Sequence, residues 1–144
     1  MISDIIKAIA LELKREFNSH KIYTEFVRQG VKKPCFFIQV NHADESGELH
    51  YKSKRIFKIL IRYVSDVDFY ESRIQDCNDV AERLLEHVEW IKVNKDILRM
   101  KNMKTRVNNE GILDFSASLT CYIEHKKEEE DMKKISLEVG AEFE

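Results

Sequence analysis

The chain has 144 residues, a length typical of one domain, and its 24 basic and 26 acidic side chains leave a formal net charge of −2. That balance gives no overall attraction to nucleic acid or to an anionic membrane. Only four glycines and one proline occur, against about ten and about seven for average usage. Since no two glycines are close in sequence, the phosphate-binding loop, the dinucleotide fingerprint and the nucleophile elbow are excluded.

The amino-terminal segment is amphipathic and charged, and it lacks the layout of a signal peptide. No apolar stretch approaches the roughly 18 residues that a membrane span needs, so we expect no membrane partner. Three scattered cysteines, Cys35, Cys77 and Cys121, do not suit a disulfide framework. Partly buried, reduced thiols in a cytosol are the expectation.

Apolar residues recur every three or four positions between Asp4 and Phe17 and predict a first helix, capped by Ser3. Strands are expected at 22–27 and, after Pro34, at 35–40. Residues 41–50 are polar and predict a loop or hairpin tip around Gly47. A longer strand is expected at about 51–64, with alternating apolar positions on one face and mostly basic ones on the other.

A second helix is predicted from Asp68 to about residue 89, with Glu71 completing a capping-box-like pair. Strands are expected at 97–108 and 112–124, and the sequence Asn-Asn-Glu-Gly at 108–111 predicts the turn between them. Residues 126–134 carry eight charges in nine positions and indicate a solvated linker or exposed helix. The alternating segment 135–139 is too short to be stable alone, so it must pair with its own sheet or another chain.

This order predicts an α+β domain over residues 1–125, with two layers, a mainly antiparallel sheet and two helices packed on one face. Residues 126–144 would follow as a charged linker and a carboxy-terminal strand or arm. We find neither an internal repeat nor an interdomain linker.

Residues that could carry chemistry are few. His42 and His50 flank the acidic residues Asp44, Glu45 and Glu48, which is a weak cation-binding pattern better explained by a solvated loop. Glu124-His125-Lys126 has the form of a nuclease motif, but its partner Asp114 stands ten residues earlier on the same predicted strand. At ~3.3 Å per residue the two acids would lie ~33 Å apart and share no metal. We therefore expect no enzyme, catalytic residue, cofactor or metal.

Charge placement is more informative than total charge. The segments 52–62 and 92–106 together hold eleven of the 24 basic residues, whereas 66–89 holds eight acids against two arginines. A basic sheet surface and an acidic helix surface on one small domain suit head-to-tail packing of identical subunits, although ordinary charge scatter is the plainer interpretation. A nucleic-acid groove is a further alternative, but the strands lack interleaved aromatic residues.

Several segments resemble the small tail terminator family of phages, prophages and contractile phage-tail-like particles of Gram-positive bacteria. The likeness lies in an amphipathic opening helix and in KIYTEFVRQGVKKPCFFIQV (21–40), FKILIRYVSD (57–66), CNDVAERLLEHVEWI (77–91), MKTRVNNEGILDFSASLTCYI (103–123) and MKKISLEVG (132–140). The elements IYTE, QG and PCFFI are its most specific part. The likeness covers nearly the whole chain, and it includes no catalytic signature.

The resemblance implies an α/β sheet with helices on one side and a ring, typically a hexamer, on the last ring of the tail tube. Such a ring ends polymerisation, docks to the neck and, in contractile tails, contacts the sheath. It would sit in a virion tail or phage-tail-like particle, with DNA only passing through its lumen. A head–tail connector or stopper and, from another class, a small nucleic-acid-binding or nuclease accessory protein are the alternatives.

Because the family offers no active site to transfer, the candidate partner contacts are positional. They come from the acidic loop, the basic strands and the terminal strand, whose alternation would allow it to extend a neighbour's sheet. The residues are Asp44, Glu45, Glu48, Lys52, Lys54, Arg55, Arg99, Lys101, Arg106, Ile135, Leu137 and Val139.

Overall fold

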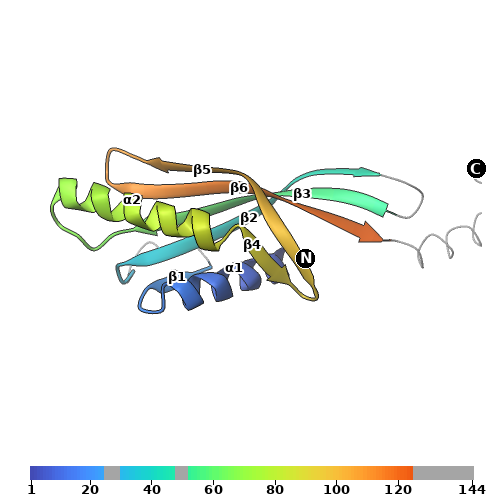
Figure 1. Ribbon diagram of the computed structural model, residues 1–144, viewed down its shortest axis with the longest axis horizontal. Helices are drawn as coiled ribbons and strands as arrows, with labels where there is room; N and C mark the ends of the chain where they lie inside the picture. Colours follow the sequence, from blue (N-terminus) through green and yellow to red (C-terminus); the bar gives the residue numbers. More distant parts are fainter. Residues whose placement is uncertain (25–29, 48–51, 125–144) are drawn as a thin grey trace, which may run out of the picture.

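The computed structural model describes residues 1–24, 30–47 and 52–124 (Figure 1). Two helices and six strands make up this part of the chain. They are α1 (Ile2–Glu16), β1 (Lys21–Tyr23), β2 (Cys35–Gly47), β3 (Lys52–Val64), α2 (Tyr70–His87), β4 (Trp90–Val93), β5 (Asp96–Val107) and β6 (Ile112–Glu124). The α+β class predicted from sequence is confirmed.

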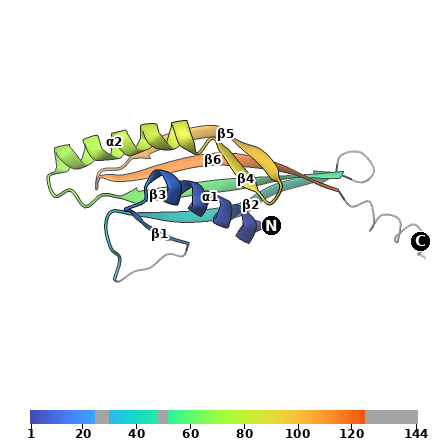
Figure 2. The same cartoon turned by 60° about the horizontal axis from the view of Figure 1, so that its bottom comes forward.

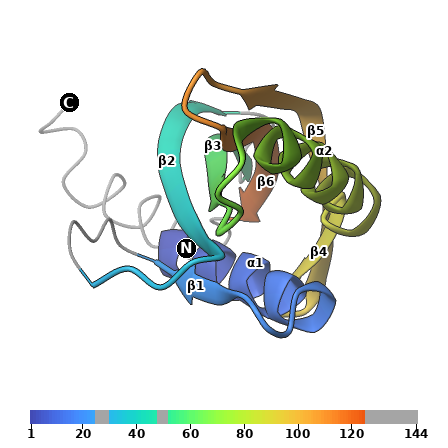
Figure 3. The ribbon, with the colours of Figure 1, turned by 90° about the vertical axis from the view of Figure 1, so that its left-hand side faces the viewer.

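The six strands form one sheet in the order β1-β2-β3-β6-β5-β4. β1 pairs with β2 in parallel and the other four pairs are antiparallel, so the sheet is mixed. The sheet is also curled, because α1 contacts β1 and β2 at one end of the strand order and β4 at the other. Figure 3 views the strands nearly end-on and shows α1 between β2 and β4. The finer prediction, two layers with both helices on one face, stays a prediction.

A single hydrophobic cluster occupies the inside of the curl. Alternate residues of β2, β3 and β6 enter it, as the period of two in a strand requires. α1 contributes Ile5, Ile9 and Leu13, and α2 contributes Cys77, Val80 and Leu84. All three cysteines are free, as predicted, and they are fully buried where partial burial was expected.

The helix starts differ from the sequence prediction. α1 begins at Ile2 with Met1 at the cap position, so Ser3 lies inside the helix. Phe69 is the cap residue of α2, and no side chain caps either helix, so the predicted Asp68 capping box is wrong. Instead, the guanidinium of Arg73 donates to the carbonyl oxygens of Val67, Asp68 and Glu110 at 2.8, 2.8 and 3.1 Å. A side chain from within the helix therefore fixes the chain that leads into it.

Two strand predictions need correction. Residues 41–47, predicted as part of a loop or hairpin tip, continue β2 to Gly47 and pair with β3 as a hairpin does, and a register shift between His42 and Asp44 marks a β-bulge. The sequence prediction missed β4, which forms a hairpin with β5 through Asn94 and Lys95. Asn94 has φ 56°, and Asn is the residue type that tolerates this conformation in two-residue hairpin turns. The predicted turn at 108–111 is confirmed, with Gly111 at φ 77°.

The far ends of β2, β3 and β6 continue beyond the amino end of α1 (Figures 1 and 2). We call this part, residues 44–47, 52–56 and 120–124, the arm. Of its side chains only Cys121 is buried, whereas the same strands bury every second residue inside the curl. The arm is therefore held mainly by strand pairing.

Candidate interaction surfaces

The side of the sheet that faces away from the core carries a concentration of positive charge. Directly opposed residues of antiparallel strands share a face, so the register defines this outer face. Its central residues are Gln39, Asn41, Lys58, Leu60, Arg62, Lys101, Lys104, Arg106, Asp114, Ser116 and Ser118, and Asp44, Lys54, Ile56 and Thr120 continue it onto the arm. Five of the central residues are basic and one is acidic, so the centre of the face is strongly cationic.

A β-bulge in β5 brings the lysines together. Lys101 lies opposite Ser118 and Lys104 opposite Ser116, with a register shift between them and Asn102 at φ 54°. In a regular strand, side chains three positions apart point to opposite faces. The extra residue of the bulge changes this alternation, so both lysines project from the outer face.

The acid at the centre of this face is already paired. Asp114 accepts hydrogen bonds from Arg62 at 2.7 and 3.2 Å, a bidentate ion pair between neighbouring strands. This contact raises the pKa of Arg62. Within the described ranges, Lys58, Lys101 and Lys104 make no ion pair. Lys58 and Lys104 line a hollow of about 350 Å³, together with Asn41, Ser116 and Ser118.

The exposed side of α2 has the opposite sign. Glu71, Gln75, Asp79, Glu82 and Glu86 recur at helical spacing on the side away from the buried residues, and all are exposed. We call these five residues the acidic stripe. Glu71, Asp79 and Glu82 have no ion-pair partner among the residues that the structure describes.

Neither arginine of α2 neutralises the acidic stripe. Arg73 is held by the three carbonyl oxygens named above. Arg83 donates to the side-chain and carbonyl oxygens of Glu16 at 3.1 and 2.6 Å and covers the ring of Phe17, 4.0 Å from its centroid. Both arginines therefore make contacts within their own subunit and leave the charge of the acidic stripe unbalanced.

The predicted contact residues separate into three groups. Asp44, Glu45, Lys52, Lys54 and Arg55 lie on the arm, where Arg55 donates to Glu45 at 2.8 Å. On β5, Lys101 and Arg106 lie on the outer face, but Arg99 lies elsewhere, against Glu89 at 2.7 Å and the ring of Trp90. The remaining four, Glu48, Ile135, Leu137 and Val139, are outside the described residues.

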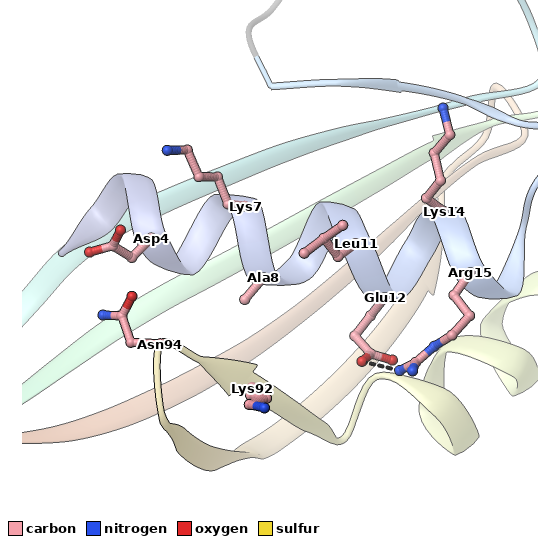
Figure 4. A pocket seen from close by; sticks show the side chains of 9 residues that line it. All are labelled: Asp4, Lys7, Ala8, Leu11, Glu12, Lys14, Arg15, Lys92 and Asn94. Carbon is pink, nitrogen blue, oxygen red and sulfur yellow. Dashed lines mark hydrogen bonds and ion pairs between the residues drawn. The ribbon is translucent and has the colours of Figure 1, made fainter.

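A second surface lies between α1 and β4 (Figure 4). It is a groove of about 680 Å³ in which Leu11, 71% exposed, and Ala8 are surrounded by charged side chains. Glu12 and Arg15 form an ion pair on its rim, Lys92 approaches from β4, and Asn94 approaches from the turn between β4 and β5. This groove, which sequence reasoning missed, is apolar at its centre, unlike the outer face.

The buried ionisable groups serve packing. Tyr63 and Ser65 both donate to Asp76 at 2.6 Å and connect the end of β3 to α2. Burial, reinforced by Asp76, raises the pKa of Tyr63 above its usual range. Burial raises the pKa of Cys77 to about 11, and its thiol donates to the carbonyl oxygen of Gly111.

No group of three or more metal-ligating side chains occurs within residues 1–24, 30–47 and 52–124. Asp114 and Glu124 stand at opposite ends of β6, the first bound to Arg62 and the second opposite Lys52 on the arm. Neither helix of the described chain has the length and hydropathy needed to cross a bilayer.

These features define a small α+β domain whose notable groups are charged surfaces and packing contacts, as in a protein that works by assembly. Residues 4–132 match the family model described as phage tail terminator protein, and the chain belongs to this family. The resemblance seen in the sequence is confirmed, and with it a structural role in tail completion within the phage tail. No curated protein sequence matches the chain.

Proposed function

We propose that the chain assembles into a hexameric ring that caps the tail tube, ends polymerisation of the tube and of any sheath, and provides the docking surface for the neck. The family match over residues 4–132 carries this proposal. The charged surfaces support it, because an acidic helix and a basic sheet face on one domain allow each copy to contact the next in the same way.

The partners in this proposal are other copies of the chain, the tube protein, and the sheath and neck proteins, with DNA only passing through the lumen. The predicted contact residues of the arm fit such a role. The arm exposes charged side chains of both signs on strands that extend past the helices. Assembly would take place in the bacterial cytoplasm.

Deleting the gene and examining particles by electron microscopy tests the proposal. A terminator ring predicts tubes of excessive and variable length, restored to uniform length by the wild-type gene. Tails of normal length that fail to join heads would instead identify a connector or stopper. Light scattering of the purified chain with tube protein provides the second measurement. A chain that stays monomeric and ignores tube ends would refute the ring.

A further inference from the structure

We infer that the outer face of the sheet is the docking site for α2 of a second copy of this chain, with the acidic stripe lying across the lysines of β3 and β5. This inference rests on the proposed ring and identifies the subunit interface within it.

The two surfaces lie on opposite sides of the domain. α2 buries Cys77, Val80 and Leu84 in the core that lines the inside of the curl, whereas Lys58, Lys101 and Lys104 project from the other side of the same sheet. A copy that offers one surface therefore leaves the other open. The contact is heterologous, and heterologous contacts close into rings when the rotation between copies allows.

The dimensions of the two surfaces match. From Glu71 to Glu86 the acidic stripe runs ~22 Å at ~1.5 Å per residue. On β3, the distance from Lys54 to Arg62 is ~26 Å at ~3.3 Å per residue. The hollow beside Lys58 and Lys104 offers ammonium, amide and hydroxyl donors, and carboxylates of a helix laid across the sheet would accept from them.

The alternative occupant of a basic face is the phosphate backbone of nucleic acid. A second copy is favoured because every chain that offers a basic outer face also carries one acidic stripe. The arginines of α2 do not neutralise that stripe, since Glu16 and backbone oxygens already bind them. Among the described residues of the outer face, Phe37 lies opposite Arg62 and Tyr122 lies on the arm opposite Lys54, and no aromatic side chain on which bases could stack lies among Lys58, Lys101 and Lys104. Complementary charge further fixes the register of such a contact and disfavours wrong partners.

Charge reversal on each surface tests the interface. The helix variant combines Asp79→Lys with Glu82→Lys, and the sheet variant combines Lys101→Glu with Lys104→Glu. Each variant alone should lose the ring at the concentration where the wild-type chain is fully assembled, because like charges then face each other at the reversed positions. An equal mixture should recover the ring with strict 1:1 alternation, since each variant's helix now complements the other's sheet. Mass photometry and native mass spectrometry measure size and composition.

The matched control is Lys21→Glu with Lys32→Glu, two exposed positions at the β1 edge of the sheet. It reverses the same number of lysines outside both surfaces and should keep the ring. Circular dichroism and thermal unfolding establish that each variant is folded before its assembly is compared.

The possible results separate this inference from the proposed function. If either variant forms a ring alone, or if the mixture does not form one, the proposed interface is wrong. The proposed ring itself would not be contradicted by these results. A sheet variant that keeps its ring but loses binding to duplex DNA in a gel shift would assign the face to nucleic acid. A wild-type chain that forms no ring, even with tube protein, would overturn both.

Discussion

Strands β2, β3 and β6 run through two regions of the molecule, the part covered by the helices and the arm. The interactions that stabilise the strands differ between these two regions. Inside the curl, β2, β3 and β6 alternate buried and exposed residues, and Phe57, Ile61 and Phe115 are at most 2% exposed. In the arm, the same strands have lost their helical cover, and Tyr122 is 61% exposed. The comparison teaches that strand pairing continues without a core where neighbouring strands and charge pairs support it. Matched substitutions in the two regions test this difference.

The largest effect is expected for Phe115→Ala, which leaves a cavity in the core of β6. It should lower the free energy of unfolding by about 3–5 kcal/mol. Tyr122→Ala, seven residues along the same strand, should change it by less than about 0.5 kcal/mol. Urea titration followed by circular dichroism measures both. Similar losses would mean that the arm contributes a core of its own.

Glycines offer the second comparison. Gly111 has φ 77°, and a Cβ added there would lie 2.5 Å from Cδ of Arg73, so Gly111→Ala must displace the side chain that fixes the start of α2. We expect a loss of about 2 kcal/mol. At Gly47, on the arm, an added Cβ meets no atom of the described residues within 4 Å, and Gly47→Ala should be neutral or slightly stabilising. Equal losses in urea titration would contradict this difference.

Two arginines provide a comparison at constant chemistry. Arg83→Ala removes the hydrogen bonds to Glu16 and the cover over Phe17, and we expect a loss of about 1–2 kcal/mol. Arg55→Ala removes an ion pair on the arm and should cost about 0.5 kcal/mol. Thermal unfolding of the two variants beside the wild type ranks them. A larger loss of stability for Arg55→Ala than for Arg83→Ala would show that the Arg55–Glu45 ion pair stabilises the arm strongly.

The smallest effect concerns His20, whose ring packs against Phe17, Phe36 and Tyr63. Burial, with a smaller contribution from Arg83, lowers the pKa of His20 below 6.5. The unfolded chain then binds the proton more readily, so stability falls as pH drops through 6.5 towards the folded pKa and is constant above 6.5. His20→Gln should flatten this part of the stability profile. An unchanged profile in urea titrations from pH 7.5 to 5.5 would contradict it.

The parts of the fold that sequence predicted are those where a core imposes a period. Both helices and the long strands β3 and β6 bury residues at regular intervals, and these intervals can be recognised in the amino-acid sequence. The end of β2 was missed because, with neither face covered, Asp44 and Ser46 need not alternate with apolar residues. β4 was missed because four residues between a helix and a turn show too little period, although Asn94 signals the turn.

The sequence predicted which segments are rich in charge, but not which of their side chains lie together on one surface. Sequence placed the lysines of β5 on a basic strand, yet only the bulge at Asn102 decides that Lys101 and Lys104 face the same way. Arg99, grouped with them in sequence, belongs to the β4–β5 hairpin and its contact with Trp90. The acidic stripe could not be predicted from sequence because only the structure shows that Arg73 and Arg83 bind other groups and leave its charge unneutralised.

The bulge in β5 makes the length of that strand a determinant of surface charge. Deleting Asn102 would remove the extra residue and leave a regular ladder, in which Lys101 and Lys104 keep Ser118 and Ser116 as partners. Met100, which is 1% exposed, would stay in the core and Lys104 on the outer face. Straightening the bulge without removing a residue would instead turn one half of β5 over, so the number of residues in this strand decides which side chains the domain presents to a neighbour.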